Sequence, residues 1–297
     1  MRVPPPKSRQ PRPSRPQAGS APGRQPAAAV MPNRAPSRAP DTRDALPNPS
    51  VARNLLLYGL HPVAAAWTNP ARRCLHLYAT PAGLAARGPA LERAAAAGLK
   101  RPQPQPIDRI VLDRMLPADA VHQGLALAAE PLPETNLDDV LIAAGAGPLT
   151  LVMLDQVTDP HNIGAILRSA AAFGAKGVIV HRRHAPDLTG VMAKAASGAA
   201  EIVPILRETN LARALDALKD AGLFVIGLDE RGPATIAEIE IGTRAVLTLG
   251  AEGPGLRRLV AEGCTALARL PTEPPIASLN VSNAAAVGLY EIARRRL

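Results

Sequence analysis

Short apolar runs alternate with helix-like segments over the second half of this 297-residue chain. The runs have the length of buried strands, and the stretches between them repeat apolar residues at helical spacing. Strands that alternate with helices pair in parallel, so the pattern predicts a parallel sheet covered by helices. The strands are expected at 151–154, 178–180, 202–206, 223–228, 246–249 and 265–270. Two helical stripes are expected at Ile163, Ile166, Leu167 and Ala170, and at Leu211, Ala214, Leu215 and Leu218.

A second set of alternating signals lies upstream, over about 51–130. Apolar runs at 54–60 and 74–78 are typical of strands, and the Ala-rich stretch 83–97 is typical of a helix. These signals predict a small α/β domain. The stretch 131–148 is rich in proline and glycine, which predicts a linker with one short helix inside it.

The first 40 residues have a composition of their own. They hold 11 of the 32 prolines and 8 Arg or Lys without an acid, which leaves 26 basic and 25 acidic groups in residues 41–297. The net charge of +9 therefore describes a basic tail on a nearly neutral body. Residues 1–50 are expected to be disordered, because they have too little apolar surface to offset their ordering entropy. Both a solvated tail and an arm that contacts nucleic-acid phosphates fit this composition.

The cysteine count and the hydropathy pattern limit the class of protein. Cys74 and Cys264 lie far apart and have no ligand-spaced Cys or His beside them, so neither a disulfide framework nor a bound metal is expected. The chain has no run of 18 apolar residues and no apolar core of a secretory signal. We therefore expect a cytoplasmic protein that does not bind membranes.

The first segment with candidate site residues is DQVTDPHNIGAILR, which joins a predicted strand to a helix. Asn162 stands where a helix N-cap belongs, and capping alone would explain it. Arg168 points about 140° away from the buried stripe at Ile163, toward Gly164 and Ala165. These small neighbours leave room for a ligand, although a solvated surface arginine is the alternative.

The second segment, LTLGAEGPGL, places three glycines and a carboxylate just beyond a predicted strand. Glycine permits positive φ and close approach of the backbone, so such a loop can surround a ligand. The glycines from Gly250 onward have the spacing G-x-x-G-x-G, which differs from the dinucleotide-binding fingerprint G-x-G-x-x-G. A plain turn would explain the glycines, whereas Glu252 at the carboxyl edge of a parallel sheet favours a site.

The third segment, LPTEPPIASLNVSNAAA, leads from a strand that ends at Leu270 through a proline-rich loop into a helix. Ser278 or Asn280 could cap that helix, and capping would explain one of them. Both polar residues bracket Leu279, next to an Ala-rich first turn. This arrangement indicates a role beyond capping.

Together, the three segments resemble the three motifs of the SpoU-type (TrmH-like) RNA 2′-O-ribose methyltransferases, in their usual order. The N-x5-R spacing of Asn162 and Arg168, the LGAEGPGL loop and the SLNVSNAAA helix carry this resemblance, which covers about 149–297. Upstream, YGLHPV and the VHQG segment near His122 resemble the small L30e-like domain of the branch that methylates a guanosine of 23S ribosomal RNA. The basic tail has no counterpart in this pattern.

The resemblance implies an α/β fold in four parts. These are a tail (1–50), an L30e-like RNA-binding domain (51–130), a linker (131–148) and a methyltransferase domain (149–297) whose parallel sheet contains a deep trefoil knot. It also implies a homodimer and S-adenosyl-L-methionine as the cofactor, without a metal. By the family pattern, backbone around Gly250, Leu270 and Leu279 holds the cofactor.

The resemblance further implies a set of catalytic residues: Arg168, Asn162, Glu252, Ser278 and Asn280. Arg168 matches the arginine that is proposed in the family as the base, although a guanidinium holds its proton so strongly that orienting the hydroxyl is physically easier. Ser278 and Asn280 would position ribose or cofactor, and Glu252 would hold Asn162 or Arg168.

The function expected from this resemblance is methylation of a ribose 2′-hydroxyl in RNA, with a guanosine of 23S ribosomal RNA or its precursor as the substrate. A transfer-RNA methyltransferase of the same fold is one alternative, and the upstream domain argues for the ribosomal branch. A non-catalytic RNA-binding scaffold is the other alternative. The presence of every polar motif residue argues against a scaffold.

Overall fold

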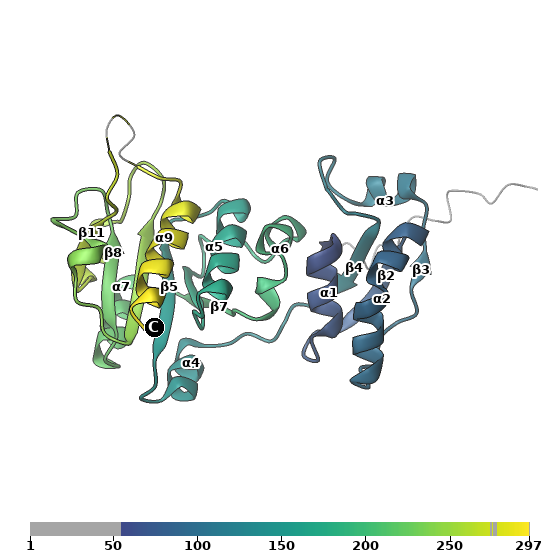
Figure 1. The fold of residues 1–297 in the computed structure, drawn as a ribbon, viewed down its shortest axis with the longest axis horizontal. Coiled ribbons are helices and arrows are strands. Elements are labelled where there is room, and N and C mark those ends of the chain that lie inside the picture. Colours follow the sequence, from purple (N-terminus) through teal and green to yellow (C-terminus); the bar gives the residue numbers. More distant parts are fainter. Residues whose placement is uncertain (1–54, 274, 276–277, 297) are drawn as a thin grey trace, which may run out of the picture. The chain divides into compact units, whose positions relative to one another are not determined.

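The computed structural model describes residues 55–273, 275 and 278–296, which belong to one compact unit (Figure 1). The predicted tail, residues 1–50, lies outside the described residues. The described residues form one sheet of four strands and one of seven. Their boundaries and pairing decide which side chains meet at the ends of the strands.

The four-stranded sheet is formed by the first part of the described chain, in the order β1-β4-β2-β3. Its centre is β4, whose five residues are all buried because apolar clusters pack on both of its faces. β4 pairs antiparallel with β1 and β2, whereas β2 pairs parallel with β3, so this sheet is mixed. The elements are β1 (Leu55–Tyr58), α1 (Leu60–Thr68), β2 (Cys74–Ala79), α2 (Pro81–Ala96), β3 (Gln105–Pro106), α3 (Arg109–Met115) and β4 (Leu125–Ala129).

The seven-stranded sheet has the order β7-β6-β5-β10-β8-β11-β9, and every pair in it is parallel. This confirms the predicted parallel α/β architecture. Its central strands are continuous apolar runs because both faces are covered. The strands are β5 (Leu149–Asp155), β6 (Val178–His181), β7 (Ile205–Glu208), β8 (Phe224–Leu228), β9 (Ala234–Thr235), β10 (Arg244–Gly250) and β11 (Ala266–Arg269).

Helices cover both faces of this sheet. Both predicted apolar stripes are fully buried, one on α5 and one on α7. The short helix predicted within 131–148 is present as α4, and its Leu137 and Val140 pack into the same core as Leu149 and Leu151. The helices are α4 (Leu137–Ala144), α5 (Pro160–Ala172), α6 (Gly190–Ala196), α7 (Leu211–Asp220), α8 (Arg258–Gly263) and α9 (Val281–Arg294), with 3-10 turns η2 (Ala199–Glu201) and η3 (Ile236–Glu238).

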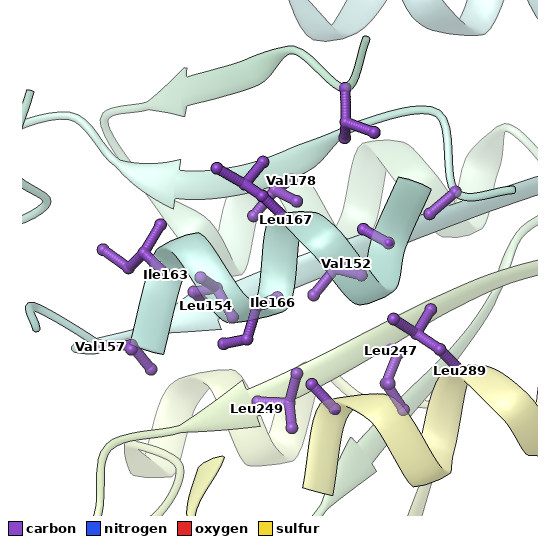
Figure 2. Packing of buried hydrophobic residues seen from close by; sticks show 14 of the residues in the cluster. Val152, Leu154, Val157, Ile163, Ile166, Leu167, Val178, Leu247, Leu249 and Leu289 are labelled. Carbon is purple, nitrogen blue, oxygen red and sulfur yellow. The ribbon is translucent and has the colours of Figure 1, made fainter. Parts of the chain in front are cut away.

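Alternate residues of β5 point to opposite cores, as the strand period of two requires. Val152 and Leu154 face one core, and Leu151 and Met153 face the other. Figure 2 shows the first core, in which α5 and α9 pack on β5 and β10 through side chains such as Ile166 and Leu289. Because α5 and α9 share this core, their first turns lie near the strand ends where the predicted site residues are found.

The structure differs from the sequence prediction between β6 and β7. The strand predicted at 202–206 begins only at Ile205, and Ile202 is largely exposed. A helix that was not predicted, α6, packs on α5, because a side chain at Gly164 would lie 2.4 Å from the Met192 carbonyl oxygen. The room expected beside Gly164 is therefore filled by α6, and it does not form a ligand site.

Among residues 55–273, 275 and 278–296, no helix is both long and apolar enough to cross a membrane. No group of three or more His, Cys, Asp or Glu in the described part of the chain is arranged to hold a metal ion.

Candidate active site

The carboxyl ends of three central strands meet at one edge of the large sheet. Gly250 at the end of β10 is in register with Asp155 at the end of β5, and Leu249 with Leu228 at the end of β8. The first and second motif segments follow β5 and β10, and the third follows β11, which pairs with β8. The edge formed by the strand ends is where ligands bind in open parallel sheets.

Three polar side chains from distant parts of the sequence form a hydrogen-bonded triangle at this edge: Asn162, Glu252 and Asn280. Glu252 Oε1 accepts from Asn280 Nδ2 at 2.6 Å and from Asn162 Nδ2 at 3.5 Å. Asn280 Nδ2 also donates to Asn162 Oδ1 at 3.0 Å. The carboxylate thereby fixes the orientation of both amides.

Local capping explains how these amides are placed. The N-cap of α5 is Asp159, which accepts from the His161 backbone N–H at 3.0 Å, so Asn162 is not the cap that its position in the sequence indicated. Asn162 is instead free to face Glu252. Asn280 does cap α9, because its Oδ1 accepts from the Ser282 backbone N–H at 2.9 Å while its Nδ2 remains in the triangle. Asn280 is therefore held from both ends of its amide.

The loop after β10 is tightly folded. Ala251 and Gly255 form an antiparallel bridge, and the Gly255 N–H donates to the Ala251 carbonyl at 3.0 Å. A side chain at Gly250 would lie 2.1 Å from the Gly255 carbonyl carbon, so only glycine fits there. This turn carries Glu252 above the strand end.

A cavity of about 360 Å³ opens beside the triangle, within the size range of small-molecule sites. The residues predicted to hold a cofactor, Gly250, Leu270 and Leu279, all line it, and so do Glu252 and Ser278. Leu279 is 41% exposed, so an apolar side chain of the cavity wall stands open to an incoming ligand. The other lining residues are Leu228, Asp229, Glu230, Arg231, Leu249, Ala251, Gly253, Pro254, Gly255, Thr272, Val281 and Ala284.

Asp229 and Asp155 each form an ion pair at the same edge, and neither was among the predicted site residues. Asp229 follows β8 and binds Arg231 through Nε at 2.8 Å and Nη2 at 2.7 Å. These hydrogen bonds hold the pKa of the Asp229 carboxyl below its usual value. The fully buried Asp155 accepts from Arg257 Nε at 2.7 Å. A carboxylate at a strand end is the sequence signal that could have found both aspartates.

The Arg168 side chain does not take part in the triangle of Asn162, Glu252 and Asn280. It is exposed on α5, and within the described part of the chain its guanidinium has no hydrogen-bond or ion-pair partner. It lies six positions after Asn162, which places the two side chains about 9 Å apart along the helix axis and about 120° apart around it. Glu252 thus contacts Asn162 and not Arg168.

Comparison with known proteins relates this fold and site to two families. Residues 149–290 match the SpoU rRNA Methylase family, and residues 56–135 match the RNA 2′-O ribose methyltransferase substrate binding family. The chain thus carries a domain that matches the SpoU rRNA Methylase family and, upstream of it, a domain that matches the substrate-binding family of RNA 2′-O ribose methyltransferases.

Individual relatives agree with this assignment. An uncharacterized tRNA/rRNA methyltransferase of Mycolicibacterium gilvum is 46% identical over 192 residues, which are 64% of this chain and 61% of the relative. The match thus spans less than two thirds of that relative.

Solved structures share the fold. A rRNA methyltransferase of Sinorhizobium meliloti is 25% identical with a TM-score of 0.65, covering 86% of this chain and 90% of its own. The SpoU methyltransferase AviRb of Streptomyces viridochromogenes, solved with its cofactor AdoMet, is 23% identical with a TM-score of 0.67, covering 84% of this chain and 94% of its own.

Proposed function

We propose that this protein transfers a methyl group from S-adenosyl-L-methionine to a ribose 2′-hydroxyl of RNA. The observation that carries the proposal is the position of the Asn162–Glu252–Asn280 triangle on the rim of the cavity, since Glu252 belongs to both. A ligand in the cavity would thus lie beside oriented polar groups that can hold a second substrate. The match to the SpoU rRNA Methylase family supports the same activity.

The cavity fits the cofactor in size and in chemistry. Leu249, Leu270 and Leu279 offer apolar surface for a heterocycle, and the Asp229 carboxylate is an acceptor for hydroxyl or amino groups. When bound, S-adenosyl-L-methionine supplies an electrophilic methyl group on a positively charged sulfur. The AdoMet held by the related AviRb supports this choice of ligand.

The residues of this chain would then orient one ribose hydroxyl, and the proton of that hydroxyl would pass to water as the oxygen is methylated. Asn280 and Ser278 at the cavity rim would hold the ribose or the cofactor, and Glu252 would keep the two amides in place. Arg168 would orient the hydroxyl or the neighbouring phosphate, because a guanidinium seldom loses a proton and is a poor base. Positioning is the main contribution in this scheme, since a neutral thioether leaves and no anionic leaving group needs stabilisation.

The proposed RNA is 23S ribosomal RNA or its precursor, with a guanosine as the target nucleotide. The match of residues 56–135 to a substrate-binding family of RNA methyltransferases, together with that of residues 149–290 to the SpoU rRNA Methylase family, supports a ribosomal RNA substrate. A transfer RNA is the second candidate, because the curated relatives are named tRNA/rRNA methyltransferases. A non-catalytic scaffold is disfavoured by the intact triangle.

We also propose the remaining family features for this chain. These are a trefoil knot in the domain 149–297, an L30e-like fold for 51–130, a linker at 131–148, a basic tail at 1–50 and a cytoplasmic location. A homodimer is supported by apolar side chains on α9, where Val287 is 43% and Tyr290 55% exposed. Phe173 of α5 packs edge-on against Tyr290, with ring centroids 6.1 Å apart, so this apolar surface spans two helices.

Cofactor binding provides the first test of the proposal. Titration of the full chain with S-adenosyl-L-methionine in a calorimeter should show micromolar binding without RNA. A folded sample that gives no heat at millimolar cofactor would contradict it. Methyl transfer to separate ribosomal and transfer RNA pools then decides between the two substrates.

A further inference from the structure

Arg87 is a buried cation without a partner in the described part of the chain. The residue is only 6% exposed, and its Nε has no hydrogen-bond acceptor. Its guanidinium forms no ion pair with any described residue. Buried charges in proteins are normally paired, because an unpaired one loses hydration without compensation. The buried Nε of Arg87 therefore has no hydrogen bond that compensates for its lost hydration.

Other arginines in the same part of the chain are well satisfied. Arg72 donates to both carboxylate oxygens of Glu201, at 3.1 and 2.6 Å. Arg101 donates to the carbonyl oxygens of Trp67, Arg72 and Asn69 at 2.7 to 2.9 Å. The missing partner of Arg87 is thus not a general property of arginines in this domain.

The position of Arg87 on α2 lets its side chain leave the buried state. It lies on a buried stripe whose other members are small: Gly83, Ala90 and Ala94. Directly beside it, a side chain at Gly88 would meet no atom within 4 Å, so the neighbouring surface is open. A rotation of the long arginine side chain can bring its guanidinium to that surface.

The excess of positive charge in the domain that contains Arg87 favours an anionic ligand. Burial, and then the charge of the exposed Arg93, lower the pKa of the Arg87 guanidinium. Residues 55–130 contain 8 Arg or Lys against 5 Asp or Glu. A phosphodiester would reduce this excess and match the guanidinium fork with two parallel hydrogen bonds.

We propose that Arg87 contacts a phosphate of the RNA backbone, and that its side chain stays buried and unpaired until RNA binds. RNA is preferred over an acidic protein partner because residues 56–135 match a substrate-binding family for RNA methyltransferases. The proposal rests on the proposed function, since it takes RNA to be the substrate.

The test is Arg87→Met, which keeps most of the side-chain length and removes the charge. Two effects of opposite sign are expected in the full chain. Melting should shift upward by about 2 to 4 °C, because an unpaired buried charge is gone. Affinity for a 23S ribosomal RNA fragment should fall about tenfold, and the slope of log affinity against log salt should flatten by about 0.7 to 0.9.

Two further variants sharpen the measurement. Arg87→Lys keeps the charge but not the fork, so it should restore part of the RNA affinity. Arg114→Met removes an exposed arginine of α3 and should leave the melting temperature unchanged. Unchanged RNA affinity in Arg87→Met, or a lower melting temperature, would overturn the proposal and make Arg87 a structural residue.

The proposed function is checked separately in the same samples. Wild-type protein should methylate the RNA fragment, and Arg87→Met should reach the same kcat at saturating RNA with a raised KM. If wild type methylates the fragment while both proteins bind it equally, only the Arg87 proposal fails. If wild type neither binds nor methylates any RNA, the proposed function fails as well.

Discussion

At the scale of single residues, Glu252 holds two amides that belong to helices far apart in the sequence. Its Oε1 accepts from Asn280 at 2.6 Å and from Asn162 at 3.5 Å. Glu252→Ala removes this shared acceptor, so we expect kcat for methyl transfer to fall about 10²-fold or more, as for loss of an oriented polar group. Adding Asn280→Ala should cost little further, since the residues act as a unit. Glu262→Ala, at an exposed ion pair with Arg258, is the matched control and should leave kcat unchanged.

Cys264 provides a residue-scale prediction about pH. Burial raises the pKa of its thiol to about 11, while its Sγ donates to the Val260 carbonyl oxygen at 3.2 Å. Below pH 9 the thiol therefore stays protonated in the folded protein and is a poor nucleophile. Alkylation by iodoacetamide at pH 8.5, followed site by site with mass spectrometry, should be about 100-fold slower than in urea. Equal rates in the two conditions would show that the thiol is not shielded.

At the scale of elements, the contact between α5 and α6 depends on one glycine. Gly164→Ala would place a side chain 2.4 Å from the Met192 carbonyl oxygen, which is backbone and cannot rotate away. We expect a loss of about 1 to 3 kcal/mol in the free energy of unfolding, measured with urea. Gly242→Ala, where no atom lies within 4 Å of the added carbon, should be nearly neutral. A neutral Gly164→Ala would mean that the helices are not in close contact.

Some of the helices and all three residues of the triangle could be predicted from the sequence, but one helix and the contacts between these residues could not. Helices α5 and α7 were predicted because their apolar stripes are long and regular, whereas α6 buries Met192, Ala193 and Ala196, a pattern too short and too small to recognise. Asn162, Glu252 and Asn280 were each identified as site residues, but the sequence could not show which of them touch. Their hydrogen bonds span up to 118 positions and depend on how the elements pack.

At the scale of the whole molecule, one buried ion pair joins the two parts that match different families. The Arg72 side chain is 0% and the Glu201 side chain 5% exposed, with Nη2 and Oε1 2.6 Å apart. Glu201→Leu should lower the free energy of unfolding by about 3 to 5 kcal/mol, because it leaves a buried arginine unpaired. Adding Arg72→Met should recover much of that loss. A double variant as unstable as the single one would contradict this account of the contact.

The central claim is that this chain methylates ribose in RNA, and one assay tests it directly. Full-length protein is incubated with ribosomal RNA and S-adenosyl-L-methionine labelled in the methyl group, and the RNA is then hydrolysed with alkali. A methylated 2′-hydroxyl cannot attack the neighbouring phosphate, so the label should remain in alkali-resistant dinucleotides. Arg168→Ala should reduce the labelling about 10² to 10³-fold while keeping cofactor affinity within a few-fold. Label in mononucleotides, or near wild-type labelling by Arg168→Ala, would contradict the account.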